Sequence, residues 1–146
     1  MIIDLNKTGF YDQHLVCHHE GRIQLLAWAG TDDALLVQLL QSVQPADSPW
    51  SLNLMLCRCI TNSGLALLKG LTHLRGLCLY GCTQIGDAGL VHLEGLPLES
   101  LTLTGTGITA AAVSSLGRMP ALKEIWQGNT NQWCRDHENY DLAVSA

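Results

Sequence analysis

The chain has 146 residues, enough for one domain, and a formal net charge of −5 with 14% charged residues. Nucleic acids and anionic membrane surfaces both attract basic stripes or clusters, so this composition argues against either as a partner. Hydrophobic residues make up 47% of the chain and aromatic residues only 5%, which predicts an aliphatic core made mostly of leucine.

The sequence also predicts a cytoplasmic protein. No apolar run reaches the roughly 18 residues that a membrane-spanning helix needs. The starting residues, MIIDLNKTGF, carry Asp4 and Asn6 where a signal peptide has a basic end and an apolar stretch. The 6 cysteines do not have the spacing of a disulfide-stabilised scaffold, and reduced thiols pack well as small apolar groups.

Residues 1–49 are expected to form an N-terminal cap. Within them, RIQLLAWAG resembles a strand, and TDDALLVQLLQS resembles a helix capped at Thr31 or Asp32 with Asp33 in its first turn. Residues 22–44 therefore look like a degenerate repeat unit, while MIIDL is either an extra strand or an extension of the cap. A stack of repeats needs such a cap to cover its first apolar layer.

Residues 50–130 contain an internal repeat. Leu74, Leu98 and Leu122 open successive units that are 24 residues apart, and another unit begins at Trp50. After each opening residue, two leucines alternate at period two, which predicts a short strand with every second side chain inward. The leucine pairs are Leu77 and Leu79, Leu101 and Leu103, and, in the unit from Trp50, Leu54 and Leu56.

Each predicted strand is followed by a turn and a helix. A small side chain lies three residues after the last strand leucine, and we expect these side chains to form a buried ladder that bonds the backbone. The ladder residues are Cys59, Cys82 and Thr106. The helices are expected to begin after the caps Thr61, Gly86 and Thr109. Their apolar faces are Leu65, Leu68 and Leu71; Leu90, Leu93 and Leu96; and Val113, Leu116 and Met119.

A strand–helix–strand unit of this length makes its strands parallel, with a right-handed crossover. Small residues near each helix start (Gly64, Gly89 and Ala112) allow the neighbouring layer to lie close. The period fades after Thr130, so residues 131–146 are expected to form a C-terminal cap or tail. The chain as a whole, residues 1–146, is predicted to be a single domain.

The pattern L-x-x-L-x-L-x-x-C/T, followed by I-T/G-x-x-G-L, resembles the leucine-rich repeat in its cysteine-containing, ribonuclease-inhibitor-like variety. The resemblance covers residues 50–130 as three repeats and a partial fourth. It implies an α/β fold: a short right-handed β-α superhelix, or solenoid, with a parallel sheet on the concave face and helices on the convex face. The family is mostly a recognition scaffold, so the resemblance implies little about activity.

The strand positions between the inward leucines are expected to face the concave side. Tyrosine and tryptophan are frequent interface anchors, so Tyr80 and Trp126 are the leading candidates. Trp126 has a second interpretation, as a side chain that closes the last layer. The full set of candidate binding residues is Met55, Cys57, Cys78, Tyr80, Thr102, Thr104 and Trp126.

A metal site is the alternative for the N-terminal part. His14, Cys17, His18 and His19 have a spacing that zinc accepts, and Cys134 and His137 form a second pair. The repeats separate these two groups, and adjacent His18 and His19 point poorly at one ion. Surface histidines around a buried cysteine are therefore the favoured interpretation, and no cofactor is expected.

Catalysis has less support than binding. A nucleophilic cysteine needs a nearby histidine and a lowered pKa, and Cys78 has no histidine at a matching strand position. We therefore expect a non-catalytic module that binds another protein through the concave sheet and adjoining loops, in the manner of an inhibitor or immunity protein. The alternative is a structural protein that forms a homodimer through the solenoid ends, where strand edges need cover.

Overall fold

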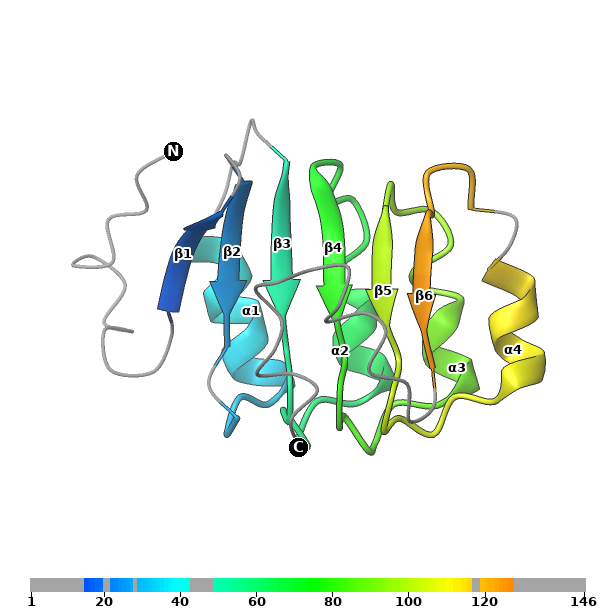
Figure 1. Cartoon of the computed structure of the whole chain (residues 1–146). Coiled ribbons are helices and arrows are strands. Elements are labelled where there is room, and N and C mark those ends of the chain that lie inside the picture. Colours follow the sequence, from blue (N-terminus) through cyan, green and yellow to red (C-terminus); the bar gives the residue numbers. More distant parts are fainter. Residues whose placement is uncertain (1–14, 20–21, 28, 43–48, 117–118, 128–146) are drawn as a thin grey trace.

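The computed structural model describes residues 15–19, 22–27, 29–42, 49–116 and 119–127. Its elements alternate strand and helix after the first strand. They are β1 (Leu15–His19), β2 (Arg22–Leu26), α1 (Asp33–Ser42), β3 (Trp50–Asn53), α2 (Asn62–Ala66), β4 (Leu74–Cys78), α3 (Asp87–Leu90), β5 (Ser100–Thr102), α4 (Ala110–Ser115) and β6 (Glu124–Trp126). The described strands form one sheet in chain order, and the helices lie together behind it, which makes this an α/β fold (Figure 1).

The sheet is parallel from β2 to β6, as predicted, but β1 pairs antiparallel with β2. The sequence analysis missed this strand, because it treated His14 to His19 as a cluster of possible ligands. Only residues 20 and 21 separate the two strands, and a connection that short can join antiparallel strands alone.

The core is aliphatic, as the composition predicts. Strand leucines that pair across the sheet, such as Leu77 on β4 with Leu101 on β5, are buried on the side of the helices. They pack with Leu65, Leu90 and other helix-side leucines in one contiguous cluster. Burying a leucine side chain contributes about 1.5–3 kcal/mol, so the repeated leucines supply the main stabilisation of each unit.

The predicted alignment of the unit from Trp50 is wrong by two positions. Leu52 pairs with Leu77, so Leu52 and Leu54, rather than Leu54 and Leu56, are the inward strand leucines. Leu52 and Leu77 are 25 residues apart instead of 24, and the extra residue is absorbed by a register shift between Trp50 and Ser51. A fixed period placed on the sequence could not detect this shift.

Leu56 consequently lies in the turn after β3, with a φ of 61°. The turn positions in the two following units are Gly81 and Gly105, with φ values of 72° and 78°. A left-handed conformation costs a leucine roughly 1–2 kcal/mol. The Leu56 side chain fills the space left by the missing Gly81 side chain, since a Cβ there would come within 2.6 Å of Leu56 Cδ2.

The ladder beneath the turns exists, but Cys57 takes the place predicted for Cys59. Cys57 and Cys82 are buried, whereas Cys59 is exposed. The Cys82 thiol donates to the Leu54 carbonyl at 3.0 Å, and the Thr106 hydroxyl donates to the Leu103 carbonyl at 2.7 Å. These small donors satisfy carbonyl groups that the turn would otherwise leave unpaired.

Successive helix starts are linked by hydrogen bonds. Thr61, Gly86 and Thr109 are the N-caps, as predicted, and the first helical residue of each unit accepts from the cap of the next. The Asp33 carboxylate accepts from the Thr61 amide at 3.0 Å and from its hydroxyl at 2.6 Å. The remaining links are Asn62 Oδ1 to the Gly86 amide at 2.9 Å, and Asp87 to the Thr109 amide at 2.7 Å and hydroxyl at 2.9 Å.

These links explain two of the small residues near the helix starts. A Cβ on Gly64 would collide with Asp33 Oδ1, and a Cβ on Gly89 would lie 2.7 Å from Asn62 Oδ1. Each glycine therefore makes room for the linking side chain of the preceding unit. The closeness of neighbouring layers, which the sequence predicts, has this specific cause.

The helices are shorter than predicted. α2 ends at Ala66 and α3 at Leu90, so Leu71 and Leu96 lie beyond them. The chain continues in turns with bonds between residues three apart, such as the Leu68 amide to the Leu65 carbonyl and the Leu71 amide to the Leu68 carbonyl. Leucines at a spacing of three suit such tight turns as well as they suit a helix.

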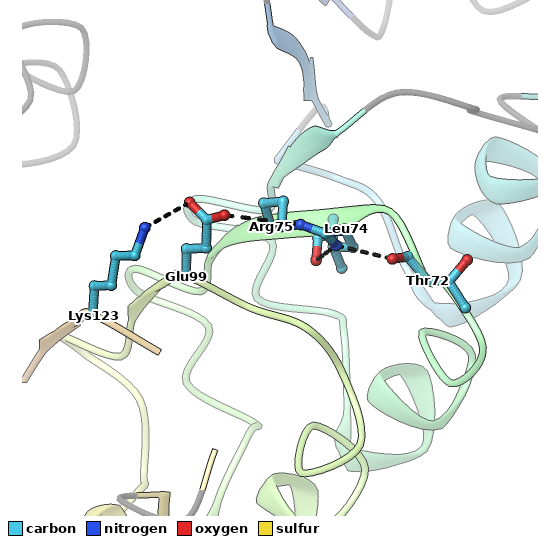
Figure 2. Close-up of polar contacts among 5 residues, drawn as sticks. All are labelled: Thr72, Leu74, Arg75, Glu99 and Lys123. Atoms are coloured by element: carbon cyan, nitrogen blue, oxygen red, sulfur yellow. Dashed lines mark hydrogen bonds and ion pairs between the residues drawn. The ribbon is translucent and has the colours of Figure 1, made fainter. Parts of the chain in front are cut away.

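An ion-pair chain crosses the edge of the sheet where β4, β5 and β6 begin (Figure 2). Glu99 lies between Arg75, with Oε1 3.9 Å from Nε, and Lys123, with Oε2 3.8 Å from Nζ. Arg75 also donates to the Thr72 carbonyl at 2.9 Å. Such exposed pairs each contribute about 0–1 kcal/mol.

No helix in the part of the chain that the structure describes has the length and apolar character needed to cross a bilayer.

Candidate binding face

The face of the sheet opposite the helices carries three rows of side chains, because successive strand residues point to opposite faces. The first row is Ser51, Gly76, Ser100 and Glu124; the middle row is Asn53, Cys78, Thr102 and Trp126. The end row is Met55, Tyr80 and Thr104, aligned by the bonds from the Leu56 amide to the Tyr80 carbonyl and from the Gly81 amide to the Thr104 carbonyl. We call these three rows together the sheet face.

The first row is shaped by Gly76. A Cβ at this position would lie 2.6 Å from Ser51 Oγ and 3.2 Å from Ser100 Oγ. The two serine side chains therefore approach one another over the glycine, and the row is low at its centre. Glu124 is the only charged residue in the three rows, which makes the sheet face nearly neutral.

The middle row is more buried than predicted. Cys78 and Thr102, both expected to be accessible, are only 2% and 3% exposed, and Asn53 is 7% exposed. Cys78 is nevertheless separate from the contiguous hydrophobic core. Side-chain length contributes to the burial: on strands about 4.8 Å apart, a thiol or hydroxyl lies deeper than the longer side chains of Met55, Tyr80 and Trp126 beside it.

Two buried donors of the middle row have no hydrogen-bond partner in the described part of the chain. They are the Thr102 hydroxyl and the Trp126 indole N–H, which lie on paired positions of β5 and β6. A buried polar group without a partner costs about 1–3 kcal/mol. An acceptor placed between the two side chains would recover part of this cost, so the pair is suited to hold a carbonyl or hydroxyl oxygen.

The end row is the most accessible part of the sheet face. Met55, Tyr80 and Thr104 are all half-buried, so Tyr80 is less exposed than an isolated surface tyrosine. The Asn53 side chain accepts from the Met55 amide at 2.9 Å, which fixes the backbone where β3 ends. Trp126 is also half-buried, which is compatible with both of its predicted roles.

Cys57 does not belong to the sheet face, contrary to the prediction. It is fully buried in the core beneath the turn, because the corrected alignment moves it to the position of Cys82. Burial, with smaller contributions from nearby Cys78 and Cys59, raises the pKa of the Cys57 thiol to about 12. Burial raises the pKa of Cys82 as well. Both remain neutral thiols near pH 7, a poor state for a nucleophile or a metal ligand.

The predicted zinc cluster is described only in part. Cys17, His18 and His19 lie in β1, and His14 lies outside the described residues, as do Cys134 and His137. Among the residues that the structure describes, no group of three or more histidine, cysteine, aspartate or glutamate residues could hold a metal ion. The zinc hypothesis therefore stays a prediction for the remaining part of the chain.

Sequence reasoning identified the sheet-face positions of β4, β5 and β6 but misplaced the end of β3. A signal for the correct alignment was present: Cys57 and Cys82 are 25 residues apart, as are Ile60 and Ile85. Aligning the turn residues rather than the opening residues would have moved Cys57 into the ladder and Leu56 into the turn.

Comparison with known proteins adds no further guide to this site: no protein-family model matches the chain, and no curated protein sequence matches it.

Proposed function

We propose that this chain is a non-catalytic protein-interaction module of the leucine-rich-repeat type. In this proposal it is a short right-handed solenoid whose concave side is the sheet face, and the partner is another protein. The in-register rows of the sheet face support the proposal most strongly, because they form an ordered surface on the side of the sheet away from the helices. The unit-to-unit bonds at the helix starts support the solenoid, since identical positions recur from layer to layer.

The chemistry of the sheet face favours recognition over reaction. Its aromatic and thioether side chains, Tyr80, Trp126 and Met55, are of types enriched at protein interfaces. Serine, threonine and asparagine side chains surround them and provide uncharged hydrogen-bonding groups. The inhibitor or immunity role is a proposal for the biological setting, in which one partner is held tightly over this surface.

A capture experiment with matched variants tests the proposed face. Tagged wild type, Met55→Ala/Tyr80→Ala and Leu67→Ala/Val91→Ala would be incubated with extract of the native cell, and bound proteins identified by mass spectrometry. Leu67 and Val91 are exposed apolar residues at the ends of α2 and α3, so the last variant removes similar side chains from the helix side. We expect at least a tenfold loss of one specific partner with the sheet-face variant alone.

Thermal unfolding followed by circular dichroism must show that both variants fold. Equal capture of every partner by both folded variants would refute binding through the sheet face. For a partner that is identified, isothermal titration calorimetry with the purified proteins would measure the loss of affinity directly.

A second candidate function is self-association through the end of the sheet at β6. Val113, Leu122 and Ile125 pack against the core there but are only partly buried, so an apolar layer remains partly open among the described residues. Pairing two such ends would cover it. Sedimentation velocity should then show a dimer that Ile125→Glu dissociates and the helix-side control Val91→Glu preserves; a concentration-independent monomer would exclude this candidate.

A further inference from the structure

We draw no further inference here: the strongest candidate, the middle row of the sheet face with its unpaired Thr102 hydroxyl and Trp126 indole N–H, carries nothing beyond the proposed interface, because nothing in the part of the chain that the structure describes shows what covers it.

Discussion

The two faces of the sheet are built on different principles. On the helix side, the same aliphatic residue recurs at each position, as in Leu52, Leu77 and Leu101, and all are buried in one cluster. On the sheet face, the neighbouring positions change from Asn53 to Cys78 to Thr102. Stacking requires equal shapes on the helix side, whereas the sheet face is free to vary. A repeat therefore standardises one face and leaves the other available for specificity.

Core truncation should give the largest effect and tests whether adjacent residues on opposite faces really differ in importance. Leu79 is fully buried on the helix side, so Leu79→Ala should destabilise the fold by about 2–5 kcal/mol through lost burial and a cavity. Tyr80→Ala, one residue further on the half-exposed end row, should cost less than half as much. Urea unfolding monitored by circular dichroism measures both.

The volume-conserving change Leu79→Met is the control, expected to cost less than about 1.5 kcal/mol. Equal destabilisation by Leu79→Ala and Tyr80→Ala would mean that both faces contribute alike to stability.

Two threonines should respond in opposite directions to the same substitution. Thr106, in the ladder beneath the turn, donates to the Leu103 carbonyl and accepts from the Ile108 amide at 3.3 Å. Thr106→Val should therefore cost about 0.5–1.5 kcal/mol or more, because it leaves backbone groups unpaired. Thr102→Val removes a buried hydroxyl that has no partner in the described part of the chain, and should stabilise the fold by up to about 1 kcal/mol.

The difference between the two unfolding midpoints is the quantity to compare. If Thr102→Val were as damaging as Thr106→Val, the Thr102 hydroxyl would have to make a bond in solution, and its status as an unpaired donor would be wrong.

The smallest effect concerns pH. The Cys57 pKa is about 12 in the fold against 9.0 for an ordinary thiol, so between these values the unfolded chain releases the proton that the folded chain keeps. The contribution of this group to stability is complete below pH 9 and is lost as the pH rises towards 12. Cys57→Ala should flatten the decline of the unfolding free energy across this interval.

Other groups also titrate in this range, so the informative quantity is the wild-type slope minus that of the variant. Cys78→Ala provides a comparison on the other face. A wild-type slope identical to that of Cys57→Ala would show that the Cys57 thiol is accessible to solvent.

Much of the fold could be predicted from particular residues. Leu74, Leu98 and Leu122 revealed the repeat, and the caps Thr61, Gly86 and Thr109 marked the helix starts, because both signals depend on local chemistry that repeats along the chain. The candidate site was predicted less well. The positions of Tyr80, Thr104 and Trp126 follow from alternation along a strand, but the burial of Cys78 and Thr102 depends on neighbours from other strands.

The sequence by itself determined the α/β class, the aliphatic core and the order of strand, turn and helix, since side-chain period and capping are local properties. Only the tertiary structure decided the register of β3, which exchanged Cys57 and Cys59 and moved Leu56 into a left-handed turn. It also decided the antiparallel pairing of β1 and the links from Asp33, Asn62 and Asp87 to the next unit. Register and such links are contacts between residues far apart in the chain, and a period of 24 residues tolerates one extra residue without losing its leucines.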